Sequence, residues 1–312
     1  MKSAKMLSGD VYCYEVATST EFRTRLSQEL GLPLKVIKLL NKDGVVPEEL
    51  TDEVYSIFID NEDRLREWIP EYKLDWRILS ANPGAVSLLE KNLEKVDWFY
   101  LSRNPNAIPL LEKNLRKVDW FHLSRNPNAV PLLEKNPDQI RWYPLSANPN
   151  AVHLFGQRRY WLDKCSISSN PSPAAVSFLE QNPDLIHPRG LSENPSAIHL
   201  LEQNPDWIHW SVLSANPAAV PLLEQNREHI DWVALSSNPN AIRLLEENPE
   251  YIEWVTLSAN PNAVHLLEQN IEKVNWSMLS RNPNAIHLLE QNQDKIDWTC
   301  LSMNPAIFYP EV

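Results

Sequence analysis

The sequence predicts a mostly α-helical protein: an α-helical solenoid of about ten 22-residue two-helix repeats, preceded by a small α+β domain. Three observations lead to this fold class. A Leu-Ser pair recurs every 22 residues through most of the chain, an Asn-Pro pair follows it, and nine of the 12 tryptophans stand three residues before the Leu. A short fixed period is typical of repeat proteins, in which each unit packs against the next. We therefore expect three regions, at 1–60, 61–75 and 76–312.

Residues 1–60 lack the repeat and predict four strands and one helix. Met1–Leu7 and Val11–Val16 are typical of strands on either side of a Ser-Gly-Asp turn. Thr18–Leu30 has helical register and is followed by a Gly that stops the helix, and Leu34–Leu40 and Val54–Ile59 are rich in strand formers. The order ββαββ, with Gly-Leu-Pro after the helix, resembles a ubiquitin-like β-grasp domain. An unrelated small α+β domain fits the same pattern.

Residues 61–75 precede the first full repeat and include Trp68 and Ile69. They predict a connecting helix that caps this repeat. The array that follows holds ten units and a terminal fragment. Its period is 22 residues except for one step of 24, between Ile167 and Leu191.

The unit from Asn238 to Ala259 shows what one repeat is expected to form. Asn238 is a good helix N-cap, and Pro239 suits the first helical position, where its missing N–H costs nothing. The apolar residues that follow cover one face of a helix, and they are Ala241, Ile242, Leu244 and Leu245. Asn248 is expected to end this helix in a left-handed conformation and to begin a second helix, which carries Trp254. Such helices are too short to be stable alone, so the units must stack.

An alternative interpretation is a strand-bearing horseshoe, because Leu-Ser-x-Asn also matches the strand and turn of a leucine-rich repeat. That repeat needs an apolar residue two positions after the Asn. Here these positions hold polar residues, namely Asn106, Asn128, Asn150, Asn240 and Asn262. The intervening Pro also removes a backbone donor. Helical pairs are therefore favoured over the horseshoe.

The repeat itself is distinctive. Over residues 76–305 it follows the string Asn-Pro-Asn-Ala-Ile-x-Leu-Leu-Glu-x-Asn-Pro-Asp-x-Ile-x-Trp-x-x-Leu-Ser-x-Asn-Pro. This string resembles repeats that are abundant in proteins of large nucleocytoplasmic DNA viruses. It is also similar, more loosely, to the all-helical leucine-rich repeat variant. The resemblance implies a viral source and a helical solenoid, and it implies no activity.

Composition excludes several classes of function. Lys and Arg number 29 against 41 Asp and Glu, a net charge of −12, which argues against binding to a nucleic-acid backbone. The 6 glycines are scattered and form no phosphate-binding loop, and Cys13, Cys165 and Cys300 lie too far apart for a zinc cluster or a disulfide framework. No apolar run approaches the roughly 20 residues that span a bilayer. We expect a protein without a cofactor or membrane segment, in the host-cell cytoplasm or in a virion.

The sequence offers no catalytic or metal-binding constellation. His-x-x-Glu pairs occur, as at His199 and Glu202, but other units place Pro or Ser at the His position, which is typical of a solvated surface. Nine glutamates recur in phase and are expected to provide solubility or ion pairs, or a negative stripe that steers a basic partner. They are Glu90, Glu112, Glu134, Glu180, Glu202, Glu224, Glu246, Glu268 and Glu290. The repeated Ser is interpreted as a packing residue, and the repeated Trp as a core anchor rather than a platform for bases.

Variation between units points to a candidate binding surface. The two positions after each Trp change most. In the early units they are Phe99/Tyr100, Phe121/His122 and Tyr143/Pro144, and in later units they are Val233/Ala234, Val255/Thr256 and Ser277/Met278. The position after Ser is Arg103 and Arg125 in the early units. Aromatic side chains beside arginines have the composition of an interaction hot spot. The candidate protein-binding residues are Phe99, Tyr100, Arg103, Phe121, His122, Arg125 and Tyr143. The alternative is that these aromatic residues thicken the core.

Two successive units, at about 155–190, depart from the repeat. Phe155–Trp161 replaces the usual Leu-Leu-Glu-x-Asn-Pro-Asp segment, Ser172-Pro173 is an insertion, and Pro188 stands where Trp belongs. These departures predict a bend in the solenoid or a functional insertion.

The sequence therefore predicts a non-enzymatic scaffold or adaptor that binds a protein partner along the solenoid, while the N-terminal domain engages a second partner. One alternative is a structural component of a virion. A nucleic-acid reader built from helical repeats is disfavoured by the acidic balance. Self-association is left open.

Overall fold

The computed structural model describes residues 64–309 without a break, and before them residues 2–6, 11–14, 21–22, 24–25, 28, 37–40 and 55–59. The chain divides into two compact units. One consists of residues 1–64 with 310–312, and the other consists of residues 65–309.

The N-terminal unit contains a four-stranded sheet. Its strands are β1 (Lys2–Met6), β2 (Val11–Tyr14), β3 (Ile37–Leu40) and β4 (Tyr55–Ile59), in the spatial order β2-β1-β4-β3. The two central strands, β1 and β4, are parallel, and each outer strand pairs antiparallel with its neighbour. All four lie within the predicted strand ranges. The predicted helix Thr18–Leu30 falls largely outside the described residues, but residues 21–22, 24–25 and 28 are helical.

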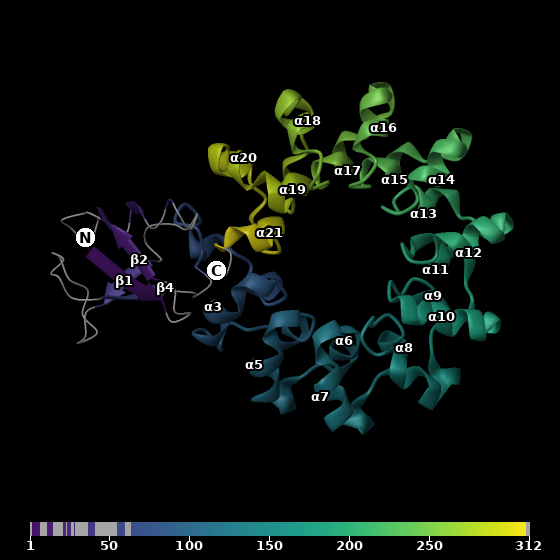
Figure 1. Ribbon diagram of the computed structural model, residues 1–312, viewed down its shortest axis with the longest axis horizontal. Helices are drawn as coiled ribbons and strands as arrows, with labels where there is room; N and C mark the ends of the chain where they lie inside the picture. The colour runs from purple at the N-terminus through teal and green to yellow at the C-terminus, as the bar shows by residue number, and fades with distance from the viewer. Residues whose placement is uncertain are drawn as a thin grey trace. The chain divides into compact units, whose positions relative to one another are not determined.

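Residues 65–309 form a closed ring of short helices in two concentric sets (Figure 1). The inner helices begin at the repeated Trp or its equivalent, and the outer helices carry the Leu-Leu-Glu segment. The inner helices are α2 (Trp76–Leu79), α4 (Trp98–Leu101), α6 (Trp120–Arg125), α8 (Trp142–Leu145), α9 (Lys164–Ser168), α11 (Pro188–Glu193), α13 (Trp210–Leu213), α15 (Trp232–Ser236), α17 (Trp254–Ser258), α19 (Trp276–Leu279) and α21 (Trp298–Leu301). The outer helices are α3 (Val86–Glu90), α5 (Ile108–Glu112), α7 (Val130–Lys135), α10 (Pro173–Gln181), α12 (Ile198–Gln203), α14 (Val220–Gln225), α16 (Ile242–Glu247), α18 (Val264–Gln269) and α20 (Ile286–Gln291). The predicted helical repeat is confirmed.

Single turns of 3-10 helix connect these helices. Those that lead into the inner helices are η2 (Glu71–Lys73), η5 (Leu115–Lys117), η7 (Pro137–Gln139), η9 (Pro183–Leu185), η10 (Pro205–Trp207), η11 (Arg227–His229), η12 (Pro249–Tyr251), η13 (Ile271–Lys273) and η15 (Gln293–Lys295). Those that follow the Asn-Pro step after an inner helix are η3 (Pro83–Ala85), η4 (Pro105–Ala107), η6 (Pro127–Ala129), η14 (Pro283–Ala285) and η16 (Pro305–Ile307).

The predicted second helix of each unit is two separate elements. In the unit from Asn238 to Ala259, only η12 begins at Pro249, and the backbone at Ile252 and Glu253 is extended before α17 starts. Asn248 is not left-handed, because its φ is −136° and its ψ is 59°. It ends α16 in another way, since its side-chain amide donates to the carbonyl oxygen of Leu244 at 2.8 Å.

The apolar stripes of the two helix sets meet in one continuous core. In the unit described above, Ala241, Leu245 and Leu257 are completely buried, and the equivalent residues of every other regular unit are buried too. Burial of one such leucine contributes about 1.5–3 kcal/mol. Helices of four to nine residues cannot persist alone, so this shared core is what keeps them folded.

A buried asparagine in each unit bonds to the unit before it. The Nδ2 of Asn238, for example, donates to the carbonyl oxygens of Ser214 at 3.1 Å and Asn216 at 2.8 Å, and its Oδ1 accepts from the N–H of Asn240 at 3.0 Å. The same side chain is therefore the predicted cap and also a bridge between units. The set is Asn82, Asn104, Asn126, Asn148, Asn170, Asn194, Asn216, Asn238, Asn260, Asn282 and Asn304, and each is at most 2% exposed. We call these residues the asparagine ladder.

The repeated Ser is a second bridge, in addition to the predicted packing role. The Oγ of Ser236 donates to the carbonyl oxygen of Trp232 at 2.8 Å and accepts from the backbone N–H of Glu253 at 3.0 Å. The equivalent serines are completely buried in every unit of the ring. Because buried polar groups without partners cost about 1–3 kcal/mol each, the ladder and these serines require a neighbour on both sides of every unit.

The first and last units satisfy this requirement by bonding to each other. The Nδ2 of Asn82 donates to the carbonyl oxygens of Ser302 and Asn304, both at 3.0 Å, and the N–H of Asp75 donates to Ser302 Oγ at 2.8 Å. The ammonium of Lys73 lies 4.5 Å from the ring centroid of Trp298, as Lys95 lies 4.1 Å from that of Trp76. The junction that closes the ring thus repeats the bonds of the internal junctions.

The unit at this junction is divided between the two ends of the array. Its inner helix and Asn-Pro turn come from residues 298–307, and residues 65–75 supply the segment that follows. The N–H of Arg66 donates to the carbonyl oxygen of Ile307 at 2.9 Å, and Leu65 forms an antiparallel bridge with Phe308. The predicted connecting helix over 61–75 is therefore wrong for residues 64–75, which hold only η2 as a helical turn. The predicted terminal fragment completes an eleventh unit.

Gly84 marks the closure in the sequence. Most other units have Asn, Ser or Ala at this position. A Cβ on Gly84 would lie 3.0 Å from Cδ2 of Phe308, which is 3% exposed and stands where internal units hold a smaller Ile or Val, such as Ile286 and Val264. The missing side chain at Gly84 therefore makes room for the residue that ends the ring.

The two irregular units keep the same bonds to their neighbours. Asn170 donates to Ser146 and Asn148, and Asn194 donates to Ser168 and Asn170, at 2.8–3.1 Å. The departures from the repeat lie in the outer layer, where the 3-10 segment η8 (Val152–Trp161) replaces an outer helix and α10 is the longest helix of its set. The ladder passes through both units without a break.

We expect Asn238→Ala to lower the free energy of unfolding by about 2 kcal/mol or more, because two buried carbonyls lose their donor and the helix turn loses its cap. Asn240→Ala is the matched control, since this exposed side chain makes one bond, to the carbonyl oxygen of Pro217. Its cost should stay under about 1 kcal/mol. Urea unfolding followed by circular dichroism measures both. Equal costs would show that the ladder does not determine the stability.

Asn82→Ala tests the closure of the ring. In a closed ring it should cost as much as Asn238→Ala, because the two side chains make equivalent bonds. In an open solenoid it would remove only the cap, worth about 1 kcal/mol. The same unfolding measurement distinguishes the two cases, and small-angle X-ray scattering of the wild-type chain gives an independent test of the ring shape.

Candidate protein-binding site

Six of the seven predicted binding residues lie on the inner helices α4, α6 and α8, and the seventh, Arg103, follows α4 by two residues. Phe99, Phe121 and Tyr143 occupy the same position in three consecutive units, immediately after the repeated Trp. They are 45%, 48% and 58% exposed, so these rings do not thicken the core.

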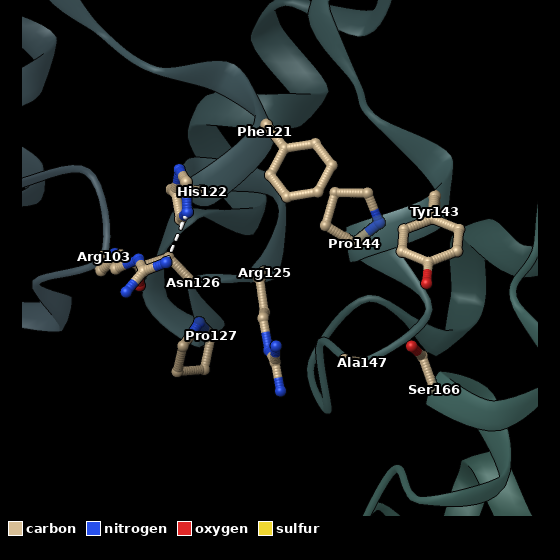
Figure 2. Close-up of a pocket in the computed structure, with 10 residues that line it drawn as sticks. All are labelled: Arg103, Phe121, His122, Arg125, Asn126, Pro127, Tyr143, Pro144, Ala147 and Ser166. Atoms are coloured by element: carbon tan, nitrogen blue, oxygen red, sulfur yellow. Dashed lines mark hydrogen bonds between the residues drawn. The ribbon is translucent and has the colours of Figure 1, made fainter. Parts of the chain in front are cut away.

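Five of the seven residues line one pocket of about 420 Å³ (Figure 2): Arg103, Phe121, His122, Arg125 and Tyr143. Phe99 and Tyr100 stand beside it, since the ring centroid of Phe99 lies 4.0 Å from that of His122. The remaining lining residues, which the sequence analysis did not identify, are Asn126, Pro127, Pro144, Ala147 and Ser166. The pocket therefore draws on four consecutive units.

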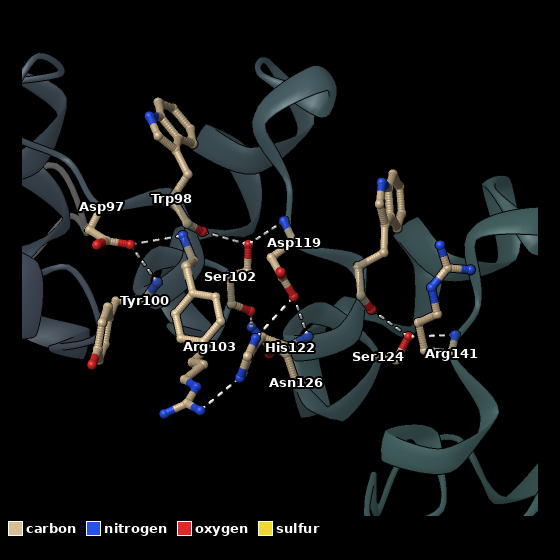
Figure 3. Close-up of polar contacts among 12 residues, drawn as sticks. Asp97, Trp98, Tyr100, Ser102, Arg103, Asp119, His122, Ser124, Asn126 and Arg141 are labelled. Atoms are coloured by element: carbon tan, nitrogen blue, oxygen red, sulfur yellow. Dashed lines mark hydrogen bonds and ion pairs between the residues drawn. The ribbon is translucent and has the colours of Figure 1, made fainter.

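A chain of polar contacts positions Arg103 at the edge of the pocket (Figure 3). Asp119 Oδ1 lies 2.9 Å from His122 Nδ1, and His122 Nε2 lies 2.7 Å from a terminal nitrogen of Arg103. Because the guanidinium can only donate, Nε2 must accept, and Nδ1 then carries the proton and donates to Asp119. Sequence analysis missed Asp119, whose position before Trp indicates only a helix cap.

The aromatic rings add cation–π contacts to this arrangement. The guanidinium carbon of Arg103 lies 5.4 Å from the ring centroid of Phe99 and 5.7 Å from that of Tyr100. The guanidinium of Arg77, from the preceding unit, lies 5.5 Å from Tyr100. Such contacts are worth about 0.5–1 kcal/mol at exposed sites and help hold both arginines in place. Arg77 extends the site by one unit. It occupies the variable position directly after Trp, so a comparison of the units could have identified it.

Comparison with family models, curated proteins and solved structures gave no match to this chain. Within the described part of the chain, every helix is too short or too polar to cross a bilayer.

The His and Glu side chains of the outer helices form pairs between units. His265 Nε2 lies 2.9 Å from Glu246 of the preceding unit, and His287 Nε2 lies 2.8 Å from Glu268. The glutamates at 90 and 112 pair with Lys113 and Lys135 in the same way. These exposed pairs contribute little to stability. Among the described residues, no three His, Cys, Asp or Glu side chains gather as a metal site would require.

The repeated Trp rings are half-buried core residues with one covered face. In seven units a side chain of the next unit lies over the indole. The pairs are Lys95 on Trp76, Lys117 on Trp98, His229 on Trp210, Tyr251 on Trp232, Lys273 on Trp254, Lys295 on Trp276 and Lys73 on Trp298. The covered faces are not available for stacking with bases.

Acidic residues at the start of the inner helices act as caps. Asp97 Oδ1 accepts from the N–H groups of Phe99 and Tyr100 at 3.0 and 3.1 Å. Asp297 accepts from the N–H of Cys300 at 3.0 Å and the hydroxyl of Ser277 at 2.7 Å, and these bonds lower the pKa of the Asp297 carboxyl. On α9, burial raises the pKa of the Cys165 thiol, which disfavours the nucleophilic thiolate.

We expect the stabilisation from Asp297 to depend on pH. The ionised carboxylate stabilises the fold above its unfolded pKa of about 3.9, and this effect is lost as the pH falls through the lower folded pKa. Asp297→Asn keeps a side-chain cap and should cost about 0.3–1 kcal/mol at neutral pH. The difference from wild type should vanish in acid. Urea unfolding across this range measures it, and Ser277→Ala should reduce the pH dependence. A difference that does not change with pH would contradict the assignment.

Proposed function

We propose that this chain is a non-enzymatic protein-interaction scaffold, in which the ring is the support and one sector of its inner helices binds the partner. The carrying observation is the cluster of Phe99, Phe121 and Tyr143 with Arg103 and Arg125. In these three consecutive units the side chain directly after Trp is a large, exposed aromatic ring. Phe121, Tyr143 and both arginines also line the pocket. Hot spots of protein interfaces are rich in aromatic and arginine side chains, as this cluster is.

The regularity of the rest of the ring supports the same proposal. The ladder asparagines, the serines and the core leucines are needed to hold every unit, whereas the position after Trp is Val233, Val255 or Ser277 in the distant units. The fold does not constrain the position after Trp, and one sector of the ring has aromatic residues there. Side chains at such a position can determine which partner binds.

We further propose that the N-terminal unit is a ubiquitin-like β-grasp domain that engages a second partner. Its sheet order β2-β1-β4-β3, with a parallel central pair, supports this assignment, as does the helical segment between β2 and β3. The resemblance of the repeat to proteins of large DNA viruses leads us to propose a host-cell cytoplasmic or virion location.

The scaffold proposal is tested with the full-length chain as bait in host-cell lysate, followed by mass spectrometry. The triple variant Phe99→Ala, Phe121→Ala, Tyr143→Ala should lose a discrete partner by at least about tenfold, because each truncated hot-spot aromatic costs about 2 kcal/mol. The matched control is Val233→Ala with Val255→Ala, which changes exposed residues at the same helix position in another sector.

Thermal unfolding must show that both variants remain folded. If the triple variant retains every partner, the proposed surface is wrong. Recovery of only capsid proteins, or of the chain itself, would favour a structural role in a particle.

A further inference from the structure

Three positions of each unit, the two after Trp and the one after Ser, together carry the opposite charge from the chain as a whole. The cap position before Trp, which holds acidic residues such as Asp97 and Asp119, is not among them. Across the ring these positions hold five arginines and one carboxylate, and the chain has a net charge of −12. The residues are Arg77, Arg103, Arg125, Arg189, Glu193 and Arg281.

The arginines around the pocket have no acidic partner. Within residues 64–309, no carboxylate oxygen lies within 4.0 Å of the guanidinium of Arg77, Arg103 or Arg125. Arg189, in another sector, lies 3.9 Å from Glu193. The outer-helix cations lie against glutamates. Arg281, in a distant sector, has no carboxylate partner either, but its Nε bonds to Cys300 Sγ at 3.3 Å. Arg103 and Arg125 are the arginines of these columns that lie in consecutive units with exposed aromatic rings.

Arg103 is preorganised for an anion. Its terminal nitrogen is held by His122 Nε2 at 2.7 Å, and its guanidinium lies against Phe99 and Tyr100. The remaining N–H groups of this planar fork are free to bind a carboxylate in a bidentate way. Arg125, from the next unit, lines the same pocket. A ligand here would meet two positive groups on one side and Phe121, Tyr143 and Pro144 on the other (Figure 2).

We propose that this pocket binds an acidic segment of a partner protein. Asp or Glu carboxylates of the segment pair with Arg103 and Arg125, and an adjacent apolar side chain packs against Phe121, Tyr143 and Pro144. This inference rests on the proposed scaffold function and names its ligand. The volume of about 420 Å³ is within the range of sites for small groups and side chains.

The observations favour an internal acidic segment over other anions. Unpaired arginines in three consecutive units match several carboxylates along an extended chain better than one terminal carboxylate. A nucleic-acid strand needs a long row of cations along its phosphate backbone, and in these columns the arginines stand in consecutive units only at Arg77, Arg103 and Arg125.

The test selects ligands with the full-length chain from a displayed library of random short peptides. Peptides with Asp or Glu next to aromatic or aliphatic residues should be enriched, and they should not be enriched on the variant Arg103→Gln, Arg125→Gln. The matched control is Arg189→Gln with Arg281→Gln, which removes two arginines from the same columns outside the pocket. No enrichment, or equal enrichment on the pocket variant, would overturn the inference.

Binding of the best peptide is then measured by fluorescence anisotropy in three forms: unmodified, with an amidated C-terminus, and with Asp and Glu replaced by Asn and Gln. A single-stranded oligonucleotide is tested separately as a competitor of the unmodified peptide. We expect the Asn/Gln form and the pocket variant to weaken binding by about tenfold or more, and amidation to have little effect. Equal binding of the Asn/Gln form, loss on amidation, or tighter binding of the oligonucleotide would overturn the proposal. The scaffold function fails separately, if no partner in lysate depends on the aromatic residues.

Discussion

The structure of the ring depends on one interaction, the bond from a buried asparagine side chain to two backbone carbonyls of the preceding unit. The side chain of Asn126 lies in the core at 2% exposure and is satisfied only by Ser102, Asn104 and its own turn. A unit that folded alone would leave these polar groups buried without partners or would have to expose its core. Folding of one unit is therefore coupled to the presence of the next, and an array with two free ends would leave one unit unsatisfied at each end. Closure removes both ends, so the ring follows from the same bond that joins neighbours.

The asparagine ladder also determines which positions of the repeat can hold different residues and which cannot. Asn, Ser and Leu at the junctions are fixed by burial and hydrogen bonding, and the outer helices are linked by exposed ion pairs that contribute little. The positions after Trp take part in few of the bonds between units, so Phe99, Val255 and Thr299 are all compatible with the same backbone. Differences between sectors of the ring are thus side-chain differences on a nearly uniform support. A binding site can change in one sector without any change in the others.

Much of the unit could be predicted from local patterns. Asn238 as a cap, Pro239 after it and the Leu-Leu stripe are features of a helix start that need no knowledge of the neighbours. The end of α16 at Asn248 was placed correctly, but its conformation was not, because the choice between a left-handed turn and a side-chain bond to Leu244 depends on how the next segment packs. The closure could not be predicted, because it joins Asn82 to residues more than 200 positions away. Gly84 and Phe308 are a local sign of it, and each is interpretable only when the other is known to lie beside it.

The candidate site was accessible to sequence analysis for the same reason that the fold was. In a repeat protein, comparison of units shows which positions are free, and Phe99, Phe121 and Tyr143 stand out against Val233 and Val255. Comparing the units in the sequence does not reveal contacts between units, such as the polar contacts that run from Asp119 through His122 to Arg103. These contacts give the arginine a fixed orientation, and this decides the chemistry of the surface. Three exposed rings alone would bind any apolar segment. With unpaired guanidinium groups held beside them in an otherwise acidic protein, the proposed site would discriminate by charge as well as by shape.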